Sequence, residues 1–301
     1  MELTILGCHS ATPRENKHTT AQVLEANGHL FLVDCGEGTQ IQLRLAKVKF
    51  SRIQHIFISH LHGDHFYGLI GLISTFRLLG RNAPLYIYGP KGIKEIISLQ
   101  LKYAKSWTDY PLHFIELEQT NQSVIFEDEV IKVSTIPLNH RIYTNGFLFE
   151  TQEGLRKINK KATAKLDLSA VQFQQLQAGH DLILSSGKEI KNEELTMAPK
   201  PVKRYAFCSD TCYDESIVPQ IEGVDLLYHE ATFLEQHIDL AIKTKHCTVK
   251  QAATIAKKAK VKSLMIGHYS NRYKDKNSFL EEGKSIFNPI HLSEDLIRIS
   301  I

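Results

Sequence analysis

The amino-acid sequence predicts an α/β fold in which helices form layers against sheets. Short β-type runs alternate with amphipathic helical segments along all 301 residues. In both halves of the chain, several predicted strands end in histidine or aspartate. With 43% hydrophobic residues, the chain can bury one large core or two modest ones. We therefore expect two similar α/β halves that face each other.

The first half of the chain is rich in strands. Its clearest turn signal is Asn27-Gly28 between two apolar runs, which is typical of a two-residue hairpin. Apolar residues three or four apart predict the helices. The helix over 66–79 has an apolar side that fits either a core or an interface. The predicted strands are 3–6, 21–26, 29–33, 56–58, 84–90, 113–117, 130–138 and 145–150, and the predicted helices are 39–48, 66–79 and 91–104.

The second half repeats this style. Thr248 and Gln251 have the spacing of a capping box at the start of a helix. The predicted strands are 181–184, 189–190, 204–208, 224–228, 261–266 and 296–301, and the predicted helices are 248–259 and 278–287.

The stretch from Ile58 to His65 carries the strongest chemical signal. Its four metal-capable residues directly follow a predicted buried strand: His60, His62, Asp64 and His65. In an extended segment, residues two apart point to one side, so His60 and His62 can reach one metal ion. Beyond Gly63 the chain bends, and Asp64 and His65 point to a second position. Imidazole and carboxylate together suit zinc, and less often manganese or iron. A turn with surface histidines is the plainer alternative, and this spacing argues against it.

A site for two metal ions needs three or four protein ligands for each ion, with one carboxylate between them. The stretch from His60 to His65 supplies only four. The remaining ligands should lie at later strand ends, where the sequence places His140, Asp210 and His268. The pair His229-Glu230 follows another predicted strand. A single histidine at a strand end is more often structural, and the other histidines are interpreted in that way.

Composition narrows the class of protein. The formal net charge of +3 is mildly basic and does not by itself indicate nucleic acid. Five cysteines without zinc-finger or redox spacing predict reduced thiols. The N-terminus lacks the pattern of a signal peptide, and no run approaches the roughly 18 apolar residues that cross a bilayer. We expect a soluble cytoplasmic protein without a membrane segment.

Residues 154–179 differ in character from the rest of the chain. Between Leu155 and Lys165 there are five basic residues and no acidic one: Arg156, Lys157, Lys160, Lys161 and Lys165. Such a segment fits an insertion that binds phosphates without reading base sequence. A merely solvated charged loop is the alternative that composition alone allows.

The motifs taken together resemble the ribonuclease Z family in its short form. The spacing His-x-His-x-Asp-His is shared by the whole metallo-β-lactamase superfamily. The resemblance to the family also rests on the blocks Asp34-Cys35-Gly36-Glu37-Gly38-Thr39-Gln40, Pro137-Leu138-Asn139-His140, Ser209-Asp210-Thr211, His229-Glu230-Ala231-Thr232-Phe233 and His268-Tyr269-Ser270-Asn271-Arg272-Tyr273. The block that begins at Asp34 and the block His229-Glu230-Ala231-Thr232 are far more specific than the histidine spacing. The resemblance covers nearly the full length.

The resemblance implies a four-layer αββα sandwich over residues 1–301, with a flexible basic arm inserted at about 154–179 that binds transfer RNA. It implies a homodimer with two zinc ions per subunit, or manganese in their place. The implied ligands are His60, His62, His140 and Asp210 for the first zinc, and Asp64, His65, Asp210 and His268 for the second. Asp64 would orient or deprotonate the attacking water, and His229, held by Glu230, would protonate the leaving 3′ oxygen.

The activity implied by the resemblance is removal of the 3′ trailer from precursor transfer RNA. The products would be a 3′-hydroxyl on the transfer RNA and a 5′-phosphate on the trailer. Two alternatives remain open: another hydrolase of the superfamily, such as a small-molecule phosphodiesterase or a thioesterase, and an RNA-binding protein with an inactive metal site. The complete ligand set argues against the inactive protein.

Overall fold

The computed structural model describes residues 1–184 and 187–301. The chain divides into two compact units. The first, which we call the body, comprises Met1–Glu127, Ile131–Glu150 and Lys203–Ile301. The second, which we call the arm unit, comprises Asp128–Val130 and Thr151–Val202. Every helix in these described ranges is too short or too polar to cross a lipid bilayer.

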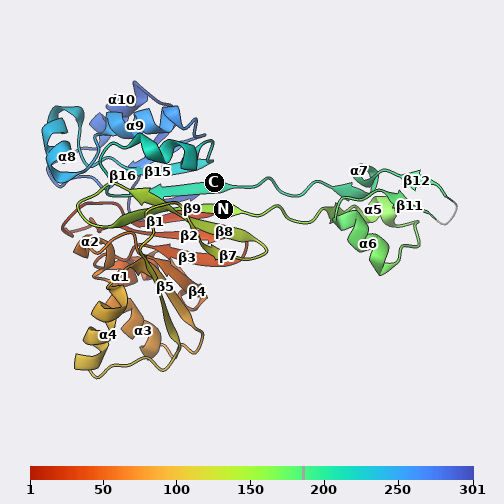
Figure 1. Cartoon of the computed structure of the whole chain (residues 1–301), viewed down its shortest axis with the longest axis horizontal. Helices are drawn as coiled ribbons and strands as arrows, with labels where there is room; N and C mark the ends of the chain where they lie inside the picture. Colours follow the sequence, from red (N-terminus) through yellow and green to blue (C-terminus); the bar gives the residue numbers. More distant parts are fainter. Residues whose placement is uncertain (185–186) are drawn as a thin grey trace. The chain divides into compact units, whose positions relative to one another are not determined.

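Two seven-stranded mixed sheets form the centre of the body (Figure 1). The strand orders are β18-β1-β2-β3-β4-β5-β6 and β17-β16-β15-β14-β9-β8-β7. The strands of the first sheet are β1 (Glu2–Gly7), β2 (Ala21–Ala26), β3 (His29–Val33), β4 (Ile53–Phe57), β5 (Leu85–Pro90), β6 (Leu112–Leu117) and β18 (Arg298–Ser300). Those of the second are β7 (Val124–Glu127), β8 (Ile131–Leu138), β9 (Thr144–Thr151), β14 (Arg204–Cys208), β15 (Leu226–Glu230), β16 (Leu264–Gly267) and β17 (Ile290–Leu292).

Helices cover the outer faces of both sheets, which confirms the predicted α/β layers (Figure 1). One side carries α1 (Thr39–Leu45), α2 (Gly63–Phe66), α3 (Leu69–Leu78) and α4 (Ile93–Tyr103). The other carries α8 (Ile238–Thr244), α9 (Val249–Lys258) and α10 (Asn277–Lys284). Short 3₁₀ turns lie at Phe50–Arg52, Glu215–Ile221 and Glu235–His237. The predicted capping box of Thr248 and Gln251 is present at the start of α9.

Strand alternation explains how each sheet is buried on both faces. In β3, Leu30 and Leu32 belong to the core beneath the helices. Phe31 lies between them in sequence and points the other way. Its ring lies 5.5 Å from the ring of Phe149 in β9, which belongs to the opposite sheet. The body therefore has an aliphatic core under the helices and an aromatic core between the sheets.

Several predicted elements have other bounds in the structure, and two of these differences lie next to the site. The helix predicted over 66–79 is interrupted at Tyr67-Gly68, where α2 ends and α3 begins. A Cβ at Gly68 would lie 2.1 Å from the carbonyl oxygen of Gly36, so the two loops need glycine to pass each other. The apolar side of this segment is core, because Phe66, Leu69, Leu72, Ile73 and Phe76 are all buried. The strand predicted over 224–228 instead occupies Leu226–Glu230, and this shift matters for the site.

The arm unit has a small core of its own. Leu176, Leu182 and Leu195 are buried together, and partly buried apolar residues surround them. Its strands pair as β10 (Lys157–Ile158) with β13 (Thr196–Met197), and β11 (Leu182–Ile183) with β12 (Glu189–Ile190). Its helices are α5 (Lys160–Thr163), α6 (Ala170–Gln177) and α7 (Asn192–Leu195). The basic segment is thus part of a folded unit.

Candidate metal centre

Loops that follow four strands of the body converge on one place. The stretch Ser59 to His65 follows β4, His140 follows β8, Asp210 follows β14 and His268 follows β16. Two groups of side chains that could hold a metal ion result: His60, His62, His140 and Asp210 in the first, and Asp64, His65 and His268 in the second. The structure therefore brings together all seven residues that the sequence singled out as ligands.

The backbone at these strand ends is unusual. Asp34 and His268 directly follow β3 and β16, and Asp210 is the second residue after β14; their φ values are 56°, 61° and 31°, respectively. Aspartate and histidine tolerate this left-handed region better than most residues, but the conformation is still costly. Each strand thus turns abruptly at the residue that carries the polar side chain. Such strain is typical of functional sites.

The first cluster consists of three ring nitrogens and one carboxylate oxygen. His62 Nδ1 lies 3.0 Å from His60 Nε2 and 3.3 Å from His140 Nε2. Asp210 Oδ2 lies 3.5 Å from His60 Nε2 and 3.7 Å from His140 Nε2. Zinc–nitrogen bonds of 2.0–2.1 Å in a tetrahedron place the ligand atoms about 3.3–3.4 Å apart. The observed spacings fit that requirement.

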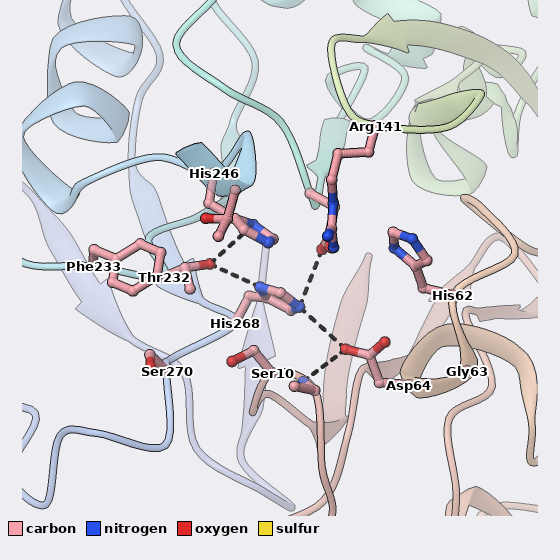
Figure 2. A pocket seen from close by; sticks show the side chains of 13 residues that line it. Ser10, His62, Gly63, Asp64, Arg141, Thr232, Phe233, His246, His268 and Ser270 are labelled. Carbon is pink, nitrogen blue, oxygen red and sulfur yellow. Dashed lines mark hydrogen bonds and ion pairs between the residues drawn. The ribbon is translucent and has the colours of Figure 1, made fainter. Parts of the chain in front are cut away.

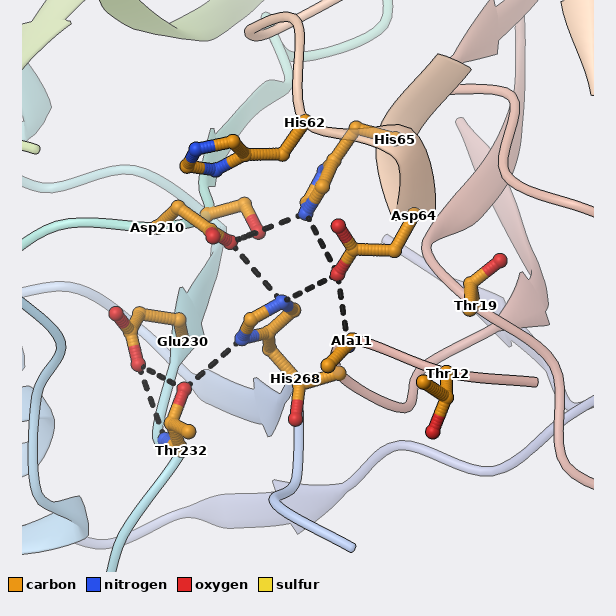
Figure 3. A network of polar contacts seen from close by, with 12 residues as sticks. Ala11, Thr12, Thr19, His62, Asp64, His65, Asp210, Glu230, Thr232 and His268 are labelled. Atoms are coloured by element: carbon orange, nitrogen blue, oxygen red, sulfur yellow. Dashed lines mark hydrogen bonds and ion pairs between the residues drawn. The ribbon is translucent and has the colours of Figure 1, made fainter. Parts of the chain in front are cut away.

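Figure 3 shows the side chains of the second cluster, Asp64, His65 and His268, with Asp210 beside them. The distances between their ligand atoms are similar to those in the first cluster. Asp64 Oδ2 lies 3.5 Å from His65 Nε2 and 3.5 Å from His268 Nε2. Asp210 Oδ1 lies 3.3 Å from His65 Nε2 and 3.1 Å from His268 Nε2. Asp210 therefore turns one carboxylate oxygen toward each cluster, which is the arrangement of a bridging ligand.

The far nitrogens of the rings are held by other groups, as in metal sites. The Nδ1 atoms of His65, His140 and His268 lie 2.7–2.9 Å from Asp34 Oδ2, the carbonyl oxygen of Lys245 and Thr232 Oγ1, respectively. The buried Nε2 atoms of His65 and His268 have no hydrogen-bond partner. Burying a ring nitrogen without a bonding partner costs free energy, unless a group that is not part of the protein binds to it. These two nitrogens therefore fit a metal ion.

The electrostatics also favour cations. The carboxylates of Asp210, Asp64 and Asp34 raise the pKa of His65 well above its usual value, although burial acts in the opposite direction. Burial lowers the pKa of His60, and it lowers that of His140 to about 4. These two rings are therefore neutral, which is the form that binds metals. Burial opposes ionisation of Asp64 and Asp210, but the neighbouring histidines outweigh it and hold both pKa values below the usual range, so these two carboxylates present negative charge to the clusters.

A cavity of about 440 Å³ opens beside the two clusters (Figure 2). Asp64, Asp210 and His268 contribute to its wall, together with Arg141, Phe233 and His246. Arg141 is exposed and makes no hydrogen bond or ion pair with any described residue. Burial lowers the pKa of His62, and the Arg141 charge acts in the same direction. A substrate in this cavity would meet a free guanidinium group.

The structure corrects one sequence-based assignment. The Glu230 carboxylate does not hold His229; it accepts a hydrogen bond from His246 Nδ1 at 2.7 Å. His229 is 1% exposed, is absent from the cavity wall, and pairs through Nδ1 with the backbone carbonyl of Glu230. Because β15 extends through Glu230, His229 and Glu230 are consecutive strand residues and point to opposite faces. The predicted catalytic pairing of His229 with Glu230 is therefore wrong.

Sequence reasoning missed His246, Arg141 and Asp34. His246 lies in the connection between α8 and α9, and Thr248 of this connection forms an isolated β-bridge with Phe233, three residues beyond the end of β15. No local motif marks it. Arg141 directly follows His140, and Asp34 opens the block Asp-Cys-Gly-Glu-Gly. Those two positions were visible in the motifs, but their contacts were not.

Comparison with known proteins is consistent with this geometry. A family model described as anti-Pycsar protein Apyc1 matches residues 1–156. A protein named Ribonuclease Z from Bacteroides thetaiotaomicron is 44% identical over 300 residues, which cover 100% of this chain and 95% of that protein. Ribonuclease Z from Cytophaga hutchinsonii is 45% identical over 295 residues, covering 98% and 94%.

Solved structures give the same result. Human tRNase Z, short form, aligns with a TM-score of 0.72 and 27% identity, covering 100% of this chain and 99% of that one. A metallo-β-lactamase fold protein from Bacillus subtilis, at 16% identity, aligns with a TM-score of 0.70 over 99% of both chains and shares the fold.

Fold and site together define a metal-dependent hydrolase of the metallo-β-lactamase fold. The chain belongs to the ribonuclease Z family, and its residues 1–156 also belong to the family described as anti-Pycsar protein Apyc1. The Apyc1 match ends before Asp210, His246 and His268, whereas the ribonuclease Z relatives span all of them. The resemblance seen in the motifs is confirmed for fold, family and enzyme class.

Proposed function

We propose that this protein is a zinc-dependent endoribonuclease that removes the 3′ trailer from precursor transfer RNA. The cut leaves a 3′-hydroxyl on the transfer RNA and a 5′-phosphate on the trailer. The observation that carries the proposal is the position of Asp210, whose two carboxylate oxygens face two separate clusters of histidine nitrogens. The full-length similarity to proteins named Ribonuclease Z supports the substrate class.

We assign His60, His62, His140 and Asp210 to one zinc ion, and Asp64, His65, Asp210 and His268 to the other. When bound, such ions lower the pKa of a water molecule and neutralise charge on the scissile phosphate. Asp64 is placed to accept the proton of the attacking water, because its carboxylate lines the cavity. Manganese fits the same nitrogen and oxygen ligands.

His246 replaces His229 as the proposed proton donor to the leaving 3′ oxygen. Its ring lines the cavity, and Glu230 holds its Nδ1 atom, which leaves Nε2 for the substrate. Glu230 is itself fixed by the backbone amides of Thr211 and Thr232 and by the Thr232 hydroxyl. The ring is therefore oriented before substrate binds, as a general acid requires.

The arm unit is the proposed binding surface for the transfer-RNA body. Arg156, Lys157, Lys160 and Lys161 line a groove of about 590 Å³ in this unit. Lys165 lies a few residues beyond them, in the same unit. Cationic side chains that release counterions on binding give phosphate affinity without base reading.

We further propose a cytoplasmic homodimer. All five cysteines are free, as expected in a reducing compartment where transfer RNA is processed.

The proposed dimer surface is apolar. The body exposes large apolar side chains on α1 and at the end of α3, and these two helices contact each other: Ile41, Leu45, Leu78 and Leu79. A second copy of the chain is the proposed cover for this surface. Light scattering tests it, because Leu45→Glu with Leu78→Glu should then yield monomers.

One experiment tests the main proposal. The purified protein is incubated with a precursor transfer RNA, and the cut is mapped with and without a chelator. We expect one cut at the 3′ side that disappears with the chelator and returns when zinc is added. Cleavage that survives complete metal removal would refute the proposal.

The second candidate is a small-molecule phosphodiesterase, which would use the same two clusters of metal ligands but would not need the basic residues of the arm unit. A variant in which the five basic residues of positions 156–165 are changed to glutamine distinguishes the two candidate functions. The main proposal predicts a raised KM for precursor transfer RNA and unchanged hydrolysis of a small phosphodiester such as bis-p-nitrophenyl phosphate. If the RNA and the small diester are hydrolysed as in the unmodified protein, the arm assignment is wrong.

A further inference from the structure

The second cluster receives one contact from outside the metal-ligand motifs. The backbone amide of Ala11 donates a hydrogen bond to Asp64 Oδ2 at 2.8 Å (Figure 3). The same oxygen faces His65 Nε2 and His268 Nε2, each at 3.5 Å. The Asp64 side chain is 12% exposed, whereas those of His65, His268 and Asp210 are between 0% and 3% exposed. Asp64 is therefore the member of the cluster with most freedom to turn toward solvent.

Ala11 presents its amide from a strained turn. Its φ is 65°, and the amide of Thr12 donates to the carbonyl oxygen of Ser10 at 2.9 Å. This is a γ-turn whose central residue has positive φ, which is the rare and strained form. An L-residue keeps such a conformation only where its surroundings enforce it. The turn therefore requires an explanation from its neighbours.

Asn271 supplies that enforcement. Its Nδ2 atom donates to Thr12 Oγ1 at 2.8 Å and lies 3.3 Å and 3.4 Å from the carbonyl oxygens of Thr12 and Ser10. The Arg14 guanidinium donates to the Asn271 carbonyl oxygen at 2.8 Å. The Asn271 side chain thus contacts the residues on both sides of Ala11. Asn271 itself lies three residues after His268 in the sequence.

We propose that Asn271 is a positioning residue for the second metal ion. It holds the γ-turn, so that the Ala11 amide keeps Asp64 turned toward His65 and His268. The inference rests on the proposed function in one respect, namely that Asp64 is a metal ligand. It adds a residue that touches neither metal nor substrate and acts through two hydrogen bonds in series.

The test is zinc titration of the metal-free, full-length protein by calorimetry, resolving two binding events. For Asn271→Ala we expect one event, the one that Asp64→Asn also weakens, to lose about 10-fold or more in affinity, as is typical when a partner of a metal ligand is removed, with the other event unchanged. Thr12→Val, which removes one acceptor of Asn271, should shift the same event in the same direction. Ala11→Gly keeps the amide and suits positive φ, so its zinc affinities should not change.

Two further comparisons decide the mechanism. Asn121→Ala is the matched control, because Asn121 is exposed and distant in sequence from the site; it should leave both binding events unchanged. In an Asp64→Asn background, Asn271→Ala should cause no additional loss, since its effect passes through that carboxylate. Equal weakening of both events, or full additivity with Asp64→Asn, would overturn the inference while leaving the proposed function intact. If the unmodified protein binds no pair of zinc ions, both proposals fail together.

Discussion

Glu230 holds His246, not its neighbour His229: the Glu230 carboxylate accepts a hydrogen bond from His246 Nδ1 across 2.7 Å. Burial is the largest single effect on the pKa of His246 and lowers it, but the charge and hydrogen bond of Glu230, together with the charge of Asp210, raise that pKa to about 9. The two residues lie 16 positions apart, at the end of β15 and in the connection before α9. Of this pair, His246 lines the cavity beside the metal clusters, whereas the Glu230 side chain is fully buried behind it.

The first prediction concerns this pair. His246→Ala should lower the single-turnover rate of precursor cleavage by about 10²–10⁴-fold, the usual contribution of a general acid. The folded state should survive, because the His246 side chain is 10% exposed and lies at the cavity wall. Circular dichroism and zinc content provide the controls.

His229→Asn is the matched comparison. Because His229 is buried away from the cavity, we expect a lower melting temperature and a nearly normal rate per folded molecule. A rate loss for His229→Asn as large as that for His246→Ala would contradict the assignment of His246, in place of His229, as the proton donor.

The second prediction concerns Asp210. Asp210→Ala removes a ligand atom from both clusters, so both zinc ions should bind more weakly. Asp64→Ala removes a ligand atom from the second cluster only. Mass spectrometry of the native protein measures the zinc-to-protein ratio after dialysis. If Asp210→Ala and Asp64→Ala lose zinc to the same degree, Asp210 does not bridge.

The third prediction concerns the free guanidinium of Arg141. A charge-assisted hydrogen bond to a substrate phosphate contributes about 1.5–3 kcal/mol, so Arg141→Gln should lower kcat/KM by about 10- to 100-fold. The slope of log kcat/KM against log salt should also fall by about one. Arg141→Lys should recover part of the loss, because it keeps the charge but not the planar fork.

Lys94→Gln on α4 is the control for the removal of one positive charge, since this residue lies in the body but outside the cavity wall. It should change neither kcat/KM nor the salt slope. An Arg141→Gln variant with the rate and salt dependence of the unmodified protein would exclude a phosphate contact.

The fourth prediction concerns stability against pH at Asp225. Burial opposes ionisation of this carboxyl, but Lys262 and the amide of Arg204 outweigh it, and its pKa lies below the usual value. A carboxyl with a lowered pKa stabilises the fold at neutral pH and loses that contribution as pH falls through its folded pKa. Asp225→Asn should therefore lower the free energy of unfolding by about 1 kcal/mol at pH 7.

The difference between Asp225→Asn and the unmodified protein should shrink as the pH falls below about 4, where the carboxyl is protonated in the unfolded chain. Urea unfolding at several pH values measures it. A difference that stays constant from pH 7 to pH 3 would mean that the substitution acts through packing instead of charge.

Much of the site could be predicted because its ligands lie in short local patterns. The stretch His60 to His65 forms a turn whose spacing alone separates two ligand pairs, and His140, Asp210 and His268 each lie within two residues of the end of a strand. The hairpin strands Ala21–Ala26 and His29–Val33 match their predicted bounds, since the turn between them is specified by two adjacent residues. Where neighbours in sequence decide the geometry, sequence reasoning succeeded.

The sequence by itself determined the fold class, the family and the residues that can bind metal. Tertiary structure alone decided which histidine serves Glu230. A strand displaced by two residues changes which side chains lie within it, and consecutive strand residues face opposite ways, so the bounds of β15 turn His229 inward. The contacts of Glu230 with His246, and of Asn271 with the turn at Ala11, join segments that are distant along the chain. Such contacts form only when the sheets and loops have packed, and no local pattern encodes them.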